Sequence, residues 1–525
     1  MKRGLILSLL LSVSAALAET WTLDTSQHTT SGNYSIKLSE SFGGEGQTSW
    51  WLDSSGSSMS GQGFSASDNV VINNPFSSDR LDGLVIDVSE VEINNLTAGG
   101  ATWVFIKAPS FGNNKFTING DLTNTGNLQI YQLDLHIKGN INTGGKSLAL
   151  GRGNNTGQAN YRVLIDGNVS GGSTLYVNSN GLIRARSAEE NTFENGLANP
   201  DTIIKGQVID TVLYSMVDPT YDAYIQVGGL SGSASAMREN TKNVTNSKTS
   251  YIILANTQDC TTSGYVREYA SGLIYTPEYG KTTFVMNGTA SQEFTSNNLL
   301  FFGGVKAISG TIKMNFNQGV SNYTYNTTDG LAVKFYSDAA GQNLTTFSHG
   351  DLELSGGTFA SASGSSTYGS FRFTNIKYES GTITLRLESA TQMDSLDISG
   401  YYSQAGDEAL VRIDGGTLTR EGSSKITFQF EGDLTWLIDD GTGSFDINDG
   451  NGAKIVSWDS GKGSALVSDD FAANNFESSG DMYKAYFEVL DDGLYVKYVA
   501  VPEPAEIAAM LGAIALGFAA YRRRK

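Results

Sequence analysis

The chain repeats one short unit, and this repeat limits the folds that are open to it. In each copy, alternating apolar residues lead to a glycine, and another apolar residue follows two places later. The spacing between unit glycines is 19 residues from Gly120 to Gly139 and 22 from Gly288 to Gly310, close to the length of one solenoid coil. The units include Phe116–Leu122, Leu135–Ile141, Val163–Val169, Ile203–Val208, Ala307–Ile312, Leu352–Gly357, Leu396–Gly400 and Val411–Leu418.

Alternation predicts strands with one buried face, and glycine permits a positive φ or a bulge where a coil turns. Stacked coils pair each strand with its neighbours above and below, so that successive coils bury one core. The predicted fold is all-β: a right-handed parallel β-helix (β-solenoid) with β caps, a signal helix and a C-terminal transmembrane helix. A series of antiparallel sandwiches is the alternative, because its turn signals recur at similar spacing.

Composition shifts suggest boundaries along the body. We expect an N-terminal β cap over 19–80, a solenoid over 81–424 with an irregular excursion near 211–250, and a C-terminal β cap over 425–500. Asp492 and Gly493 lie between two alternating runs, which predicts a hairpin that closes the open end of the solenoid. In repeat texture alone, the body resembles autotransporter-like parallel β-helix proteins.

The N-terminus has the pattern of a secretory signal peptide over 1–18. A basic start and an apolar run lead to Ala16 and Ala18, a small-x-small site that predicts cleavage before Glu19. Cys260 is the single cysteine, so no disulfide can form within the chain, and we expect a small buried side chain there.

The C-terminus, 501–525, combines a proline break, an apolar segment and a basic end. Val501, Pro502, Glu503 and Pro504 precede an apolar stretch over 505–521, and the chain stops at Arg522, Arg523, Arg524 and Lys525. The four cations favour the cytoplasmic side of a membrane. A terminal helix docked on the protein is the alternative. This end resembles the PEP-CTERM sorting signals, which implies an exosortase-type membrane transpeptidase as partner and a membrane anchor before processing.

Charge excludes one class of partner. The chain carries 35 basic and 54 acidic residues, a net charge of -19, and removing both terminal signals makes the exported part more acidic still. Such a surface repels phosphate backbones, so we expect no nucleic acid partner.

Candidate catalytic residues are few. His28, His136 and His349 lie far apart and in no metal motif. Aspartates within or beside the units would suit a polysaccharide lyase or glycoside hydrolase if stacking gathered them, but aspartate beside glycine more often serves a turn. These aspartates are Asp121, Asp166, Asp210, Asp397 and Asp414.

Two acidic stretches, Asp439–Gly441 and Asp446–Gly452, suggest Ca²⁺, but their spacing departs from that of an EF-hand and favours turns. We therefore predict no catalytic residue, no metal ligand and no cofactor, with Ca²⁺ as the weaker alternative. The predicted function is a noncatalytic protein of the cell surface or extracellular matrix. The alternatives are the polysaccharide-active enzyme and an adhesin that stacks Trp50, Trp51 or Trp103 on extracellular polysaccharide.

Overall fold

The structure is a computed structural model of the chain, in which β-strands predominate. It describes residues 18–27, 34–43, 48–59, 63–74, 81–101, 103–109, 114–151, 162–177, 202–216, 222–240, 249–270, 281–318, 323–324, 332–345, 347–362, 368–405, 409–439, 452–462, 465–501 and 504–524. The chain divides into two compact units, described separately below. The first comprises 1–185 and 201–206, and the second comprises 186–200 and 207–525.

The first unit consists of three parallel ladders, in which each strand pairs with the third strand after it in sequence. The first ladder contains β1 (Thr20–Leu23), β4 (Asn69–Asn74), β7 (Leu96–Gly100), β10 (Leu122–Asn124), β13 (Ile141–Asn142) and β16 (Val169–Ser170). The second contains β2 (Tyr34–Lys37), β5 (Leu81–Val85), β8 (Val104–Lys107), β11 (Leu128–Tyr131), β14 (Leu148–Leu150) and β17 (Thr174–Val177). The third contains β6 (Glu90–Ile93), β9 (Lys115–Ile118), β12 (Asp134–Ile137), β15 (Val163–Ile165) and β18 (Thr202–Ile204). β3 (Trp51–Leu52) pairs antiparallel with β1, and the short helix α1 spans Leu38–Ser41.

The core of this unit is built from like residues in register. One isoleucine from each strand of the third ladder pairs with the isoleucine of the next, and all five are fully buried. Burying each such side chain contributes about 1.5–3 kcal/mol. The alternating pattern therefore predicts the buried face correctly. The five are Ile93, Ile118, Ile137, Ile165 and Ile204.

The glycines of the sequence repeats in the first compact unit have a different role from the positive φ or bulge expected of them. Gly120, Gly139, Gly167 and Gly206 have no positive φ, so they are not needed for an unusual backbone conformation. They are needed because the backbones of successive repeat units approach closely. A Cβ on Gly167 would lie 2.4 Å from the carbonyl oxygen of Gly139, and one on Gly139 would lie 2.4 Å from that of Gly120. The N–H of Gly139 donates to Gly120 at 2.9 Å, and that of Gly167 donates to Gly139 at 3.1 Å.

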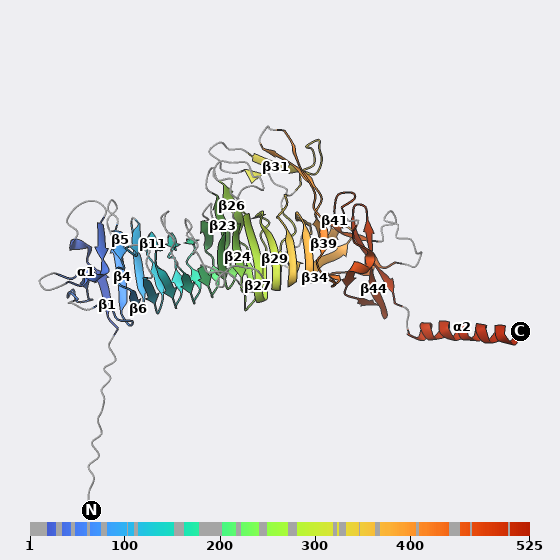
Figure 1. Cartoon of the computed structure of the whole chain (residues 1–525), viewed down its shortest axis with the longest axis horizontal. Helices are drawn as coiled ribbons and strands as arrows, with labels where there is room; N and C mark the ends of the chain where they lie inside the picture. The colour runs from blue at the N-terminus through green and yellow to red at the C-terminus, as the bar shows by residue number, and fades with distance from the viewer. Residues whose placement is uncertain are drawn as a thin grey trace, which may run out of the picture. The chain divides into compact units, whose positions relative to one another are not determined.

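The second unit continues with longer strands, several of which lie side by side in Figure 1. Its main parallel ladder contains β21 (Ala223–Val227), β24 (Thr249–Leu254), β27 (Lys281–Phe294), β29 (Gly304–Met314), β32 (Leu352–Ser361), β34 (Ile376–Ser389), β40 (Ile426–Glu431) and β42 (Phe471–Ala473). Gly310, Gly356 and Gly381 have φ of 69°, 143° and 113°, and register shifts interrupt the β27–β29 and β32–β34 pairs. Here glycine does mark an irregular corner, as expected.

The range 211–250 does not leave the ladders where the structure describes it. β20 (Val212–Met216), β23 (Ser235–Asn240), β26 (Val266–Ala270) and β28 (Leu299–Leu300) form a second parallel ladder, and β22 (Leu230–Ser231) pairs with β19 (Val208–Ile209). Residues 217–221 and 241–248 lie outside the described residues, so the irregular excursion expected near 211–250 stays a prediction. Within the polar run of this range, Arg238 points inward, only 3% exposed, and its register partner on β26 is the buried Glu268.

Burial of Glu268 makes the stability of the protein depend on pH. Burial raises the pKa of Glu268 from 4.5 to about 7, although Arg238 lowers it. The folded state therefore holds this proton more tightly than the unfolded state, and stability falls as pH rises from about 4.5 to about 7. Glu268→Gln should flatten this dependence in urea titrations across that range. An unchanged pH slope in the variant would contradict it.

Two further sheets complete the second unit. An antiparallel sheet contains β30 (Tyr323–Thr324), β31 (Ala332–Tyr336), β37 (Tyr401–Ala405) and β38 (Val411–Ile413). A mixed sheet contains β33 (Ser370–Arg372), β36 (Ser395–Asp397), β41 (Ala453–Ser457), β45 (Gly493–Ala500), β44 (Asp481–Leu490) and β43 (Phe476–Ser478). The predicted hairpin is confirmed: β44 and β45 pair antiparallel, with Asp491 and Asp492 between them.

Helix α2 (Pro504–Arg524) occupies the range in which a transmembrane segment over 505–521 is expected. Among the residues that the structure describes, no helix combines the length and apolar character needed to cross a membrane. The fold is thus all-β with long parallel sheets, a result compatible with the expected β-solenoid.

Candidate functional site

A groove in the second unit is the most promising site in the described chain. Its cavity measures about 390 Å³ and lies between the outer face of the main parallel ladder and the antiparallel sheet of β31, β37 and β38. Strands of the main parallel ladder and the segments next to them supply most of its lining, and Phe335, Tyr401, Ser403 and Ile413 come from the antiparallel sheet. The ladder residues include Tyr224, Tyr251, Thr283, Lys306 and Glu353, and Asp351 directly precedes β32.

The register of neighbouring strands explains why the outer face of the ladder has a groove at this point. Tyr224 pairs with Tyr251, Tyr251 with Thr283, and Thr283 with Gly304. Asp351 stands one coil further, because its neighbour Leu352 pairs with Val305. This outward column therefore changes from two large rings to two small residues and then to a carboxylate. Of these two small residues, Thr283 lines the cavity, and its short side chain leaves space between the rings and the carboxylate.

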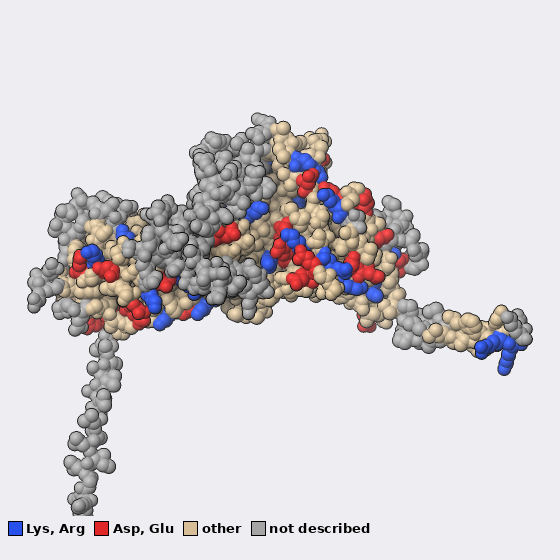
Figure 2. All heavy atoms as spheres, viewed as in Figure 1, with Lys and Arg blue, Asp and Glu red and all other residues tan. Residues whose placement is uncertain are grey.

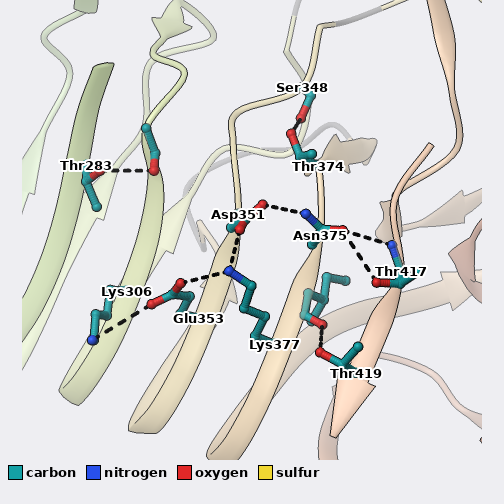
Figure 3. A network of polar contacts seen from close by, with 12 residues as sticks. Thr283, Lys306, Ser348, Asp351, Glu353, Thr374, Asn375, Lys377, Thr417 and Thr419 are labelled. Carbon is teal, nitrogen blue, oxygen red and sulfur yellow. Dashed lines mark hydrogen bonds and ion pairs between the residues drawn. The ribbon is translucent and has the colours of Figure 1, made fainter. Parts of the chain in front are cut away.

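A network of charges forms the carboxylate end of the groove (Figure 3). Lys377 Nζ lies 2.6 Å from Asp351 Oδ2 and 3.2 Å from Glu353 Oε1. Lys306 Nζ lies 3.8 Å from Glu353 Oε2, and the Asn375 amide donates to Asp351 Oδ1 at 2.9 Å. The hydrogen bond to Asp351 raises the pKa of Lys377, which therefore stays charged at neutral pH. Figure 2 shows basic and acidic side chains interspersed on one face of the molecule.

The aromatic end is rigid. The rings of Tyr224 and Tyr251 stack with centroids 4.7 Å apart and planes 5° apart. Burial raises the pKa of Tyr251 and of Tyr401, so both phenols keep their protons at neutral pH. The Arg372 guanidinium lies 5.3 Å from the Tyr401 ring centroid and is itself paired with Asp397, which fixes the antiparallel side of the groove.

These groups can hold a polar ligand through donors, acceptors and a ring face. Within the described ranges, no three histidine, cysteine or acidic side chains gather as a metal site would require. The groove thus offers binding chemistry without an assembled metal centre among those residues.

The structure does not gather the predicted aspartates into one site. Asp121 belongs to a ladder of side chains: the backbone N–H of Asp121 donates to Asn95 at 2.7 Å, and its own Oδ1 accepts from the N–H of Asn140 at 2.7 Å. The N–H of Asn168 donates to Asn140 in the same way at 2.9 Å. Asp121 therefore links coils rather than shaping a single turn.

The other four aspartates have separate partners. Asp210 accepts hydrogen bonds from the N–H and hydroxyl of Ser233 at 2.7 and 3.0 Å, and Asp397 holds Arg372. The Asp414 side chain is 90% exposed, 3.8 Å from Arg412. Asp166 Oδ2 lies 2.8 Å from His136 Nε2, and its Oδ1 lies 2.7 Å from Lys205 Nζ. None of the five lines the groove.

Replacing Asp166 should have little effect, because its two ion pairs are partly exposed. Partial burial acts in the opposite direction, but hydrogen bonds from Lys205 and His136 lower the pKa of Asp166 overall. Asp166→Ala should reduce the free energy of unfolding by no more than about 1 kcal/mol in urea titration. A loss several times larger would show that this cluster does more than link strands.

The remaining predicted residues mostly prove structural. His349 is fully buried among Phe301, Phe347 and Phe371, and burial lowers its pKa to about 4. Cys260 is buried as expected, and burial raises the pKa of its thiol. Residue His28 lies outside the described residues.

The tryptophans do not form an exposed row. Trp51 is fully buried, and its indole N–H donates to Ser41 Oγ at 2.8 Å. Trp50 and Trp103 are half-buried, and neither lines the groove. The adhesin alternative thus loses Trp51 as a stacking surface.

The terminal and acidic segments are described only in part. Ala18 and Glu19 precede β1, and the Glu19 carbonyl accepts the N–H of Asn69 at 2.7 Å. Asp439 pairs with Lys497 at 2.6 Å. Val501 is exposed, Pro504 begins α2, and Arg522, Arg523 and Arg524 end it. Ala16, Pro502, Glu503, Lys525 and the acidic range 440–451 lie outside the described residues.

The groove residues are not among those predicted from the sequence, although one signal in the sequence points to them. Leu352 and Leu354 alternate with Glu353 in the repeat unit Leu352–Gly357, which places Glu353 on the outward face. Examining outward positions of successive units would have drawn attention to Glu353 and Lys377. Their pairing also requires knowing which strands are neighbours, as only the structure shows.

Comparison with known proteins finds no family model, no curated protein and no solved structure that matches this chain.

Proposed function

We propose that the protein is an exported, noncatalytic component of the cell surface or extracellular matrix, built on a right-handed parallel β-helix. The pairing of every third strand in the first unit supports this fold. A long ladder with a binding groove suits a protein that holds other molecules in place.

The position of Lys377, beside the groove and in contact with two of its lining carboxylates, carries the noncatalytic part of the proposal. Its ammonium nitrogen lies between Asp351 and Glu353, at 2.6 and 3.2 Å. It therefore occupies the space that a scissile bond would need between two catalytic carboxylates. A charged lysine with a raised pKa also lacks the free amine that a lyase base requires at neutral pH.

The proposed export and sorting of the protein rest on the sequence patterns of its two termini. The signal peptide pattern predicts a mature start at Glu19, and the likeness of 501–525 to PEP-CTERM signals predicts an exosortase-type transpeptidase as partner and a transient membrane anchor. Extracellular polysaccharide is the proposed matrix contact. The acidic surface supports the expectation of no nucleic acid partner.

A panel of polysaccharides tests the noncatalytic proposal. The purified exported polypeptide is incubated with each polymer, and the products are assayed for new reducing ends and for unsaturated sugars. We expect neither. Sustained release of either product would overturn the proposal.

The second candidate is a glycoside hydrolase or polysaccharide lyase acting at the same groove. Its support is that one nitrogen contacts both Asp351 and Glu353, which places two carboxylates close together in a cavity. It requires Lys377 to move away when substrate binds. If the panel shows cleavage, Asp351→Asn and Glu353→Gln should each abolish it, and loss in neither variant would place the activity elsewhere.

A further inference from the structure

We propose that the groove binds a ring of a neutral saccharide, stacked on Tyr251 and hydrogen-bonded at the end formed by Asp351. This inference rests on the proposed function, in which the groove binds without cutting. Neither tyrosine nor the charged network of Asp351, Glu353 and Lys377 figures among the residues expected from sequence.

The spacing of the ladder gives the groove suitable dimensions. Tyr251 and Asp351 stand on strands three steps apart, and hydrogen-bonded strands are about 4.8 Å apart, so roughly 14 Å separates the two positions. The intervening positions hold Thr283 and Gly304. Of these two, Thr283 lines the cavity, and its small side chain leaves a floor on which a flat ring fits between the aromatic end and the carboxylate end.

Tyr251 is prepared to act as a stacking surface. Tyr224 covers one face of its ring at 4.7 Å, so the other face is directed along the column toward the small Thr283. Side chains already held in place lose little conformational entropy when a ligand binds. Aromatic rings present a flat apolar surface with a polar tip, which matches the C–H face and hydroxyl rim of a sugar.

Hydroxyl-binding groups surround the rest of the cavity. Asp351 and Glu353 are acceptors, while Lys306 and the phenol of Tyr401 are donors. Ser348 and Thr374 line the same cavity, and Ser348 Oγ lies 2.6 Å from Thr374 Oγ1. Their hydroxyls can both donate and accept hydrogen bonds. Such a mixture suits the hydroxyls of a sugar, each of which also donates and accepts.

The charges at the groove and the net charge of the chain favour one class of saccharide. Lys306, Lys377 and the cavity-lining Lys281 stand against Asp351 and Glu353, a local excess of one positive charge, whereas the whole chain has a net charge of -19. A polyanionic chain would meet repulsion from the protein with little local compensation. We therefore assign neutral hexose or pentose polymers rather than polymers of uronic acid.

Calorimetric titration of the full exported polypeptide with neutral oligosaccharides tests the inference, with oligouronates as the comparison. Tyr251→Ala should weaken binding of the neutral ligand at least tenfold. Thr283→Phe should abolish it by filling the floor, while the inward face of β27 stays unchanged. Tyr486→Ala removes a half-exposed tyrosine of β44, in the mixed sheet and far from the groove residues in sequence, and serves as the matched control.

The outcomes separate this inference from the proposed function. Binding of neutral ligands, lost in the two groove variants and kept in the control, supports it. The inference is wrong if the folded wild-type protein binds no neutral saccharide or prefers oligouronates. It is also wrong if the Thr283→Phe variant binds the neutral ligand as tightly as the wild type. Those results leave the noncatalytic proposal standing, whereas release of cleaved products overturns that proposal even when binding is confirmed.

Discussion

At a pH above the Glu268 pKa of about 7, replacing Arg238 with methionine should lower the free energy of unfolding by about 3–5 kcal/mol, because the change leaves Glu268 buried without its cationic neighbour. Arg238 and Glu268 are 3% and 1% exposed and are register partners on β23 and β26. Glu268 also accepts the backbone N–H of Phe302 at 3.1 Å and that of Thr282. These bonds hold the carboxyl group in place when the guanidinium is removed.

The double variant Arg238→Met with Glu268→Leu separates the pair from its surroundings. Removing both charges avoids the buried unpaired carboxylate, so this variant should recover most of the stability lost in the single change. Urea titrations of the wild type, both single variants and the double variant form a complete cycle. If the double variant is less stable than Arg238→Met, the two residues do not act as a pair.

Replacing Gly167 with alanine should destabilise the first unit by about 3 kcal/mol, the upper end of the usual effect of overpacking. The added Cβ would lie 2.4 Å from the Gly139 carbonyl oxygen, a backbone atom that cannot rotate away. The N–H of Gly167 donates to this same oxygen at 3.1 Å, so separating the coils also weakens that hydrogen bond. Thermal and urea unfolding measure the loss.

Gly63→Ala is the matched control in the same unit. Gly63 has no positive φ, and a Cβ there would meet no atom within 4 Å. Its replacement should leave the midpoint of unfolding unchanged or slightly raised, since alanine restricts the unfolded chain. Equal losses in both variants would show that the close approach at Gly167 is not what makes glycine necessary.

The buried faces of the fold follow from sequence. Alternation around Ile118, Ile137 and Ile165 is enough to identify the inward residues, because the period of a strand is two and only one of its faces meets the core. The hairpin before Gly493 is equally local, since its turn and both of its strands are adjacent in sequence. Local patterns thus predict the strands and the direction of their side chains.

The role of the unit glycines does not follow from sequence. A glycine at a corner satisfies two different needs, a positive φ or the close approach of another backbone, and the sequence pattern is the same for both. Gly310 shows the first, with φ of 69°, and Gly167 shows the second. Only the position of the neighbouring coil distinguishes them.

The groove is hidden from sequence for a related reason. Tyr251 and Asp351 are far apart along the chain, and the register of four strands places them at the two ends of one groove. Its other wall comes from β31, β37 and β38, an antiparallel sheet that the parallel repeat does not predict. Arg238 misleads in the opposite direction, because a charged residue suggests a surface segment unless its buried partner Glu268 is known.

The mass of the mature polypeptide, recovered from the producing cells, tests the central claim of an exported and sorted surface protein most directly. The account predicts a chain that begins at Glu19 and ends within 501–504, found in the envelope or the extracellular material. A full-length chain from Met1 to Lys525 in the cytosol would contradict it.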